Sequence, residues 1–469
     1  MKPIRRQGVL ALALAGGLSV ASLAGYRILT RDYRYFHLVK LGDDLMAEGL
    51  PFQATRAYGT AIRAKPADPM AYIKRAAAQR KQGNLSPAIE DLEAASRRST
   101  DRIQISLRLA DLYYEAERFD EAARHYEEVS ALDPGEASVL YKLALVRFRA
   151  GREAAAIEAL NRAAAIREGF WEAYYLRGAI FRALGATDEA AADFRRALEL
   201  HPEAKPARKT LIDLYLENSE PGKAMELVQT ELDENPEAPE PYLHLADVHR
   251  LEGRQEEALE AVGLALEQDP NLPEAYLALG ELWLEEATRR GDTVSADKAV
   301  AALESAVKMN PSSGRAALEL GRAYLVVGEE ARGFAELQRA SEATPVQAEA
   351  HRLLGDLYRA RDNDAEAVTA YHVFLRLRGD SPAVLDRLGD TYTDLGNPAR
   401  PRRSTRGSRR SSPAGSRRSS RPPGHFSRRE NPYPRRASAG ADWRQIPRTR
   451  HFSLFSTRHA AGQPRESER

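Results

Sequence analysis

The sequence predicts an all-α fold, an α-solenoid of about ten helical hairpins followed by a terminal helix. Two observations predict this class. A pattern of apolar and small residues returns every 34 residues from residue 35 to about residue 399, and no segment shows the alternation typical of a strand. One hairpin cannot bury its own apolar faces, so each must stack on copies of itself.

Residues 171–204 show how one unit is built. In the predicted first helix, Gly178 and Phe181 fall on the same face at helical spacing. Gly185 ends that helix, and a second apolar helix follows it. Pro202 closes the unit because proline cannot continue a helix.

The units share one register, in which every step is 34 residues except one of 41. Small residues recur at the eighth and twentieth positions, where two closely crossing helices leave no room for a larger side chain. Larger apolar residues fill the seventh position and predict a continuous core. The units begin at residues 35, 69, 103, 137, 171, 205, 239, 273, 314, 348 and 382.

Residues 1–34 predict a membrane-targeting segment. The run 7–26 carries no charge, lies between basic residues, and at 1.5 Å per residue reaches roughly the ~30 Å of a bilayer core. Its length favours an uncleaved anchor, whereas its weak hydrophobicity and the small residues at 22–24 suit a cleaved signal peptide. Either way the chain is expected to be membrane-anchored or exported. In the anchored form, an interfacial belt would comprise Tyr26, Tyr33, Tyr35 and Phe36.

The repeat pattern resembles the tetratricopeptide repeat family over residues 35–398. The family's large, small and aromatic signature stands almost complete at Leu279, Gly280, Trp283, Ala299 and Pro311. This resemblance implies a right-handed superhelix whose concave groove binds peptides or proteins. It implies a scaffold, and we expect one in an envelope-associated assembly.

Residues 399–469 form an Arg-, Ser- and Pro-rich tail whose composition is typical of disorder. Its net charge is +15, which leaves −14 for residues 1–399. One interpretation is a basic arm for nucleic acid. The other is a shifted reading frame, which we favour because the tail's 19 basic residues include no lysine. A nucleic acid partner is therefore not expected.

No motif in the sequence indicates catalysis, a cofactor or a metal site. Cysteine is absent, and we find no metalloprotease, serine hydrolase or phosphate-binding motif. His244 and His249 are five residues apart, a spacing that does not place both on one helix face for a metal. The alternative to a scaffold is the repeat portion of an enzyme, similar to a glycosyltransferase or sulfotransferase, whose catalytic domain is lost after residue 398.

In the family, positions two, five, six, nine and twelve of each first helix line the groove. Here they predict a basic ladder, an aromatic stripe and an acidic zone. Each set has an alternative interpretation, since acids could form pairs within the array and rings could pack between hairpins. The basic ladder comprises Lys40, Lys74, Arg108 and Lys142. The aromatic stripe comprises Tyr114, Tyr141, Phe148 and Tyr175. The acidic zone comprises Asp213, Asp247 and Glu281.

Two units depart from the pattern. The sixth has Ile212 and Glu231 where small residues are usual, which predicts looser packing between its helices. The eighth contains seven extra residues around 285–295, which we expect to extend a loop.

Overall fold

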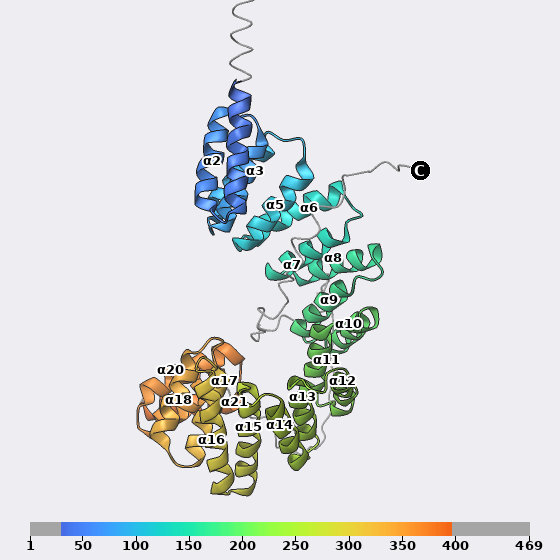
Figure 1. The fold of residues 1–469 in the computed structure, drawn as a ribbon. Helices are drawn as coiled ribbons and strands as arrows, with labels where there is room; N and C mark the ends of the chain where they lie inside the picture. The colour runs from blue at the N-terminus through green and yellow to red at the C-terminus, as the bar shows by residue number, and fades with distance from the viewer. Residues whose placement is uncertain (1–29, 396–469) are drawn as a thin grey trace, which may run out of the picture. The chain divides into compact units, whose positions relative to one another are not determined.

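The computed structural model describes residues 30–395, and every regular element within that range is a helix (Figure 1). The helices form two units. The N-terminal unit takes in the described residues up to Phe181 together with Ala192–Pro202, and the C-terminal unit takes in Arg182–Ala191 and the described residues from Glu203. The predicted membrane segment, residues 7–26, and the tail, residues 399–469, lie outside the described residues.

The predicted hairpins are confirmed, since first helices begin within one residue of the expected starts from residue 69 onward. A helix over residues 30–47 precedes α2. In the N-terminal unit the helices are α2 (Pro51–Ala64), α3 (Pro69–Lys81), α4 (Leu85–Ser96), α5 (Arg102–Glu115), α6 (Phe119–Leu132), α7 (Ala137–Arg149) and α8 (Glu153–Ile166). Two helices have residues in both units, α9 (Trp171–Leu184) and α10 (Thr187–Leu200).

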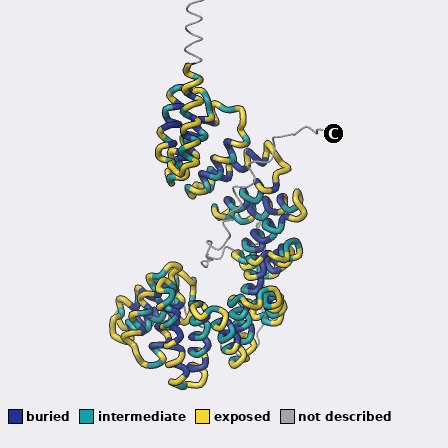
Figure 2. Tube along the Cα trace, in the orientation of Figure 1, coloured by how far each residue is buried: buried dark blue, intermediate teal, exposed yellow. Residues whose placement is uncertain are grey.

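The C-terminal unit continues the same alternation of first and second helices. These are α11 (Lys205–Glu217), α12 (Pro221–Glu234), α13 (Glu240–Leu251), α14 (Gln255–Gln268), α15 (Pro273–Arg290), α16 (Thr293–Met309), α17 (Gly314–Val326), α18 (Glu330–Glu342), α19 (Ala348–Ala360), α20 (Asp364–Arg378) and α21 (Pro382–Asp394). Figure 2 shows buried residues where helices face one another and exposed residues at the turns.

The small eighth position has a physical cause in the side chain at position twenty-four of the same unit. A Cβ atom added at Gly355 would lie 2.6 Å from the Tyr371 ring, and one at Gly321 would lie 2.8 Å from Leu337. Both distances are below ordinary contact, so a larger residue would displace a buried side chain. The close helix crossing expected from the sequence is therefore present, and its partner is position twenty-four.

The eighth hairpin corrects one expectation. The seven extra residues do not extend a loop, because they lengthen both helices, giving 18 residues in α15 and 17 in α16. Seven residues are about two helical turns, so one turn added to each helix keeps the same faces in contact. Gly291 ends α15 with φ of +69°, a conformation that favours glycine. Asp292 then accepts the Ser295 N–H at 2.7 Å and begins α16.

The sixth hairpin is packed less extensively, as the sequence predicts. Helices α11 and α12 contact each other less than α13 and α14 do. Ile212 is fully buried at the crossing position, and α12 buries only Ala224 and Val228. Ser219 holds the turn with φ of +57°, which costs a residue with a side chain more than it costs glycine. These features predict that this hairpin unfolds more readily than its neighbours.

Candidate protein-interaction face

Positions two, five, six, nine and twelve of the first helices define what we call the first-helix face. A polar contact repeats along it between consecutive hairpins. The carboxylate at position nine accepts a hydrogen bond from the tyrosine at position twenty-four and pairs with the cation at position six of the next hairpin. The three sets are Asp43 with Tyr58 and Lys74, Asp111 with Tyr126 and Lys142, and Asp356 with Tyr371 and Arg387.

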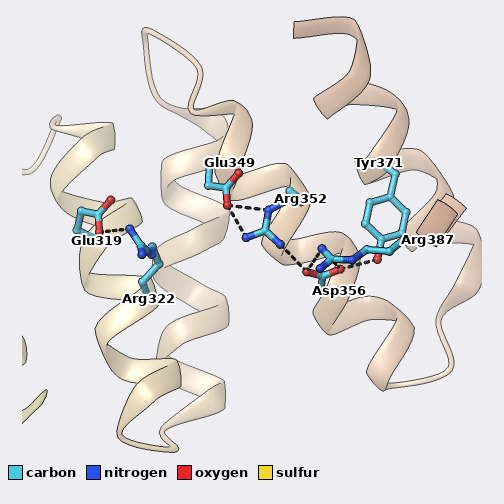
Figure 3. A network of polar contacts seen from close by, with 7 residues as sticks. All are labelled: Glu319, Arg322, Glu349, Arg352, Asp356, Tyr371 and Arg387. Carbon is cyan, nitrogen blue, oxygen red and sulfur yellow. Dashed lines mark hydrogen bonds and ion pairs between the residues drawn. The ribbon is translucent and has the colours of Figure 1, made fainter. Parts of the chain in front are cut away.

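The third of these sets is drawn in Figure 3. The Tyr371 hydroxyl donates to Asp356 at 2.7 Å, and Arg387 donates to the same carboxylate at 2.8 Å. Burial raises the pKa of Tyr371, and the neighbouring carboxylate raises it further, so the phenol stays protonated as a donor. Tyr371 also covers Gly355, so one side chain both fills the helix crossing and holds the carboxylate.

The predicted basic ladder divides into two kinds of residue. Lys74 and Lys142 pair with the preceding hairpin at 2.7 Å and 2.9 Å. Arg108 is exposed and makes no ion pair with any described residue, because its register partner in the preceding hairpin is Ala77. Lys40 is likewise exposed and unpaired within residues 30–395, where no hairpin precedes its own.

The predicted aromatic stripe also divides. Tyr114, Tyr141 and Phe148 are half-buried on the first-helix face. Tyr141 packs against Phe170 with ring centroids 5.5 Å apart, and burial raises its pKa. Tyr175 is only 8% exposed and packs against Phe194 within its hairpin, at 5.8 Å between centroids. For Tyr175 the structure favours packing over ligand contact.

The predicted acids differ in their partners. Asp247 pairs with Arg250 of its own helix at 3.0 Å, and Glu281 takes a two-pronged contact from Arg315, with both distances 2.7 Å. Burial raises the pKa of Glu281 and also that of Asp213. Asp213 accepts no hydrogen bond from any described residue.

Three polar contacts were not predicted from the sequence pattern. Glu231, where the family favours alanine, lies 2.9 Å from His244 Nδ1, and both side chains are mostly buried. The helical faces of α17 and α19 carry further pairs, Glu319 with Arg322 and Glu349 with Arg352 (Figure 3). The spacing of three residues within one helix is a signal that could have identified the last two.

Residues 30–395 contain no group of three or more His, Asp or Glu side chains placed to hold a metal ion. No helix in the same range is long and apolar enough to cross a membrane.

The family models agree with this geometry. Tetratricopeptide repeat models match residues 39–102, 107–169, 171–203, 239–282 and 295–357, which together make up more than half of the chain. The chain belongs to the tetratricopeptide repeat family. Proteins with these repeats generally bind protein partners, and the repeat fold is typically a non-catalytic scaffold. No curated protein matches the chain.

Several solved structures are similar to parts of this chain. One is MamA, 28% identical, covering 34% of this chain and 95% of its own, with a TM-score of 0.33. A tetratricopeptide repeat protein from Parabacteroides merdae is 20% identical, with 50% and 94% covered and a TM-score of 0.39. The human IFIT1 dimer with m7Gppp-AAAA is 16% identical, with 70% and 86% covered and a TM-score of 0.41. With TM-scores below 0.5, these likenesses say nothing of a partner for this chain.

Proposed function

We propose that the chain is a non-catalytic scaffold that binds an extended segment of a partner protein on the first-helix face. The family supports a protein partner. The single observation that carries the location is Arg108, which has no ion-pair partner among residues 30–395 although hairpins lie on both sides of its own. Peptide binding on this face would give Arg108 the carboxylate that Ala77 does not supply.

The other cations on the first-helix face of the second to fourth hairpins are already paired. Lys74 pairs with Asp43, Arg80 of α3 with Glu115 of α5, and Lys142 of α7 with Asp111. Among the described residues, Arg108 is the cation left unpaired on this part of the face. Tyr114 lies six residues further along the same helix, and its half-buried ring offers apolar surface.

This arrangement fits a segment with an acidic side chain near apolar ones. An exposed ion pair contributes only ~0.2–1 kcal/mol, so the charge would orient the segment while the rings supply more of the affinity. Lys74 and Lys142, which already pair within the array, would contribute less than Arg108. Of the four predicted ladder residues, Lys40 and Arg108 are left without an ion pair among the described residues, and we propose Arg108 as the principal contact.

We further propose that residues 7–26 tether the scaffold at a membrane or direct its export. The evidence for this is the uncharged run and its basic flanks. The tail is not proposed as a binding element, and nucleic acid is not proposed as a partner.

Photo-crosslinking tests the proposed location. Benzoylphenylalanine would replace Tyr114 in the full chain, and a matched variant would carry it at Arg162, an exposed and unpaired residue of the second helix α8. We expect the variant at position 114 to form adducts with a partner protein in the source cells, and the variant at 162 to form none. Equal adducts from both positions, or none from 114, would contradict the proposal.

A further inference from the structure

Exposed apolar side chains gather at the start of the array. Tyr33 is 76% exposed, Phe36 63% and Met70 49%. Tyr33 and Phe36 are three residues apart on the helix over residues 30–47, so they lie on one face, and Lys40 lies one turn further along it. Single exposed apolar residues are common, but several gathered at one end of an array point to an interaction surface.

Lys65 connects the two helices that carry these side chains. Its Nζ lies 5.7 Å from the centre of the Phe36 ring and 3.6 Å from the Asp68 carboxylate. Asp68 in turn accepts the backbone N–H of Met70 at 3.0 Å. Phe36 therefore contacts Lys65, and Met70 lies two residues after Asp68, the acid that pairs with the same lysine. We call Tyr33, Phe36 and Met70 the N-terminal patch.

Tyr35 does not belong to the patch. It is 1% exposed and is part of the core, so the belt expected from the sequence has to be corrected at this residue. Tyr33 and Phe36 contribute little to the folded core, because the hairpin leaves both rings exposed.

The surroundings of the patch are basic. Arg31, Arg34 and Lys40 are exposed. The two nearby acids, Asp32 and Asp68, both pair with Lys65, and Arg31 also approaches Asp32. Counting these six side chains, the positive charges exceed the negative ones by two.

We propose that the N-terminal patch lies in the interfacial layer of a bilayer that contains anionic lipid. Aromatic rings favour this layer, and exposed Lys and Arg are attracted to anionic headgroups. The proposal rests on the membrane segment 7–26. Phe36 and Met70 are position two of the first and second hairpins, so the patch includes the start of the first-helix face, whereas the peptide proposed above lies at Arg108 of the third hairpin. Four Cα steps from Tyr26 to Thr30 span at most ~15 Å, so an anchored chain holds the patch close to the bilayer surface.

The absence of cysteine makes a direct test available. Single cysteines would replace Phe36, in the patch, and Phe52, which is 70% exposed near the start of α2. The eleven helical steps from residue 36 to residue 47 separate the two labels by roughly 16 Å along the hairpin. Each full chain would carry a nitrobenzoxadiazole label and be reconstituted with vesicles of phosphatidylcholine, with or without phosphatidylglycerol. Circular dichroism would verify folding.

We expect the label at residue 36 to shift its emission to the blue and to be quenched by nitroxide-bearing lipid, while the label at residue 52 stays in water. Phosphatidylglycerol should strengthen the quenching. If the chain floats with the vesicles but both labels stay in water, docking of the patch is wrong and the anchor stands. If the chain does not float, the membrane segment is wrong as well. The label at residue 36 could also become shielded from water in the absence of vesicles, to a degree that grows with protein concentration. That result would show that a second copy of the chain covers the patch, and it would overturn the proposal.

Discussion

Lys142 donates a 2.9 Å hydrogen bond to Asp111 of the preceding hairpin, 31 residues earlier in the chain. The same register joins Lys74 to Asp43 and Arg387 to Asp356. Lys74 and Lys142, which the sequence predicts as groove residues, thus serve as links between neighbouring repeats. In an array whose stability depends on neighbour interfaces, such links hold adjacent hairpins in register.

A double-mutant cycle on Asp111 and Lys142 should detect this link. Asp111→Ala is expected to cost about 1–3 kcal/mol, because it leaves the Tyr126 hydroxyl and Lys142 without their acceptor. The coupling between the two residues should be ~0.2–1 kcal/mol, since both side chains are partly exposed. Denaturant unfolding followed by circular dichroism measures both quantities. The more exposed pair Arg196 and Glu199 should couple more weakly, and equal coupling in the two pairs would refute the link.

Much of this arrangement was within reach of the sequence. The 34-residue register predicted where first helices begin, and the same register places position nine 31 residues before position six of the next unit. Asp111 and Lys142 could therefore have been paired in advance. Tyr175 could not have been assigned to the core, because position alone does not tell whether a ring turns toward Phe194 or toward a ligand.

The extended hairpin was missed for another reason. A count of seven residues fits either a longer loop or one more turn in each helix. Only the left-handed turn at Gly291 and the cap at Asp292 decide between the two. In the sequence alone, Glu231 appears as a departure from the usual alanine that weakens packing. In the fold it lies next to His244, which is its polar partner.

The glycine at the helix crossing gives a second prediction. Gly355→Ala should destabilise the C-terminal unit by about 1–3 kcal/mol, because the new methyl group would overlap the Tyr371 ring. Gly263→Ala is the matched control, since that helical glycine has no neighbour within 4 Å of the added atom. The control should be neutral or stabilising by up to ~1 kcal/mol. Thermal unfolding of both variants measures the difference, and similar melting temperatures would contradict the crossing geometry.

Tyr175→Ala is expected to reduce stability by about 3 kcal/mol or more, as for other buried aromatic rings. Tyr175→Phe should be much milder because it keeps the contact with Phe194. Tyr114→Ala, at a half-buried position, should reduce folding stability less than Tyr175→Ala does. Urea unfolding compares the three variants. A stable Tyr175→Ala variant that fails only in partner binding would return Tyr175 to the interaction face.

The pH dependence of stability provides a fourth prediction. Burial raises the pKa of Asp213, so the folded state disfavours its ionised form. The resulting loss of folding stability is fully present above the raised pKa of Asp213. It shrinks as pH falls through that pKa and vanishes below the ordinary aspartate pKa of ~3.9. Asp213→Asn should therefore raise the melting temperature near neutral pH, with a benefit that shrinks on acidification. As a control, Asp386→Asn at an exposed position should change the melting temperature little at any pH. If the stabilisation by Asp213→Asn instead grew on acidification, the predicted direction of the pH dependence would be wrong.

Selection of peptides on the full chain is the most direct test of a partner-binding first-helix face. A display library of random linear peptides would be panned, and the selected peptides measured on the Arg108→Gln and Arg162→Gln variants at two salt concentrations. We expect the selected peptides to carry acidic residues beside apolar ones. Arg108→Gln should lower their affinity two- to five-fold, equivalent to ~0.5–1 kcal/mol, and should make that affinity less dependent on salt. Arg162→Gln should bind like the unchanged chain. Selected peptides without acidic residues, or equal binding to both variants, would contradict the proposal.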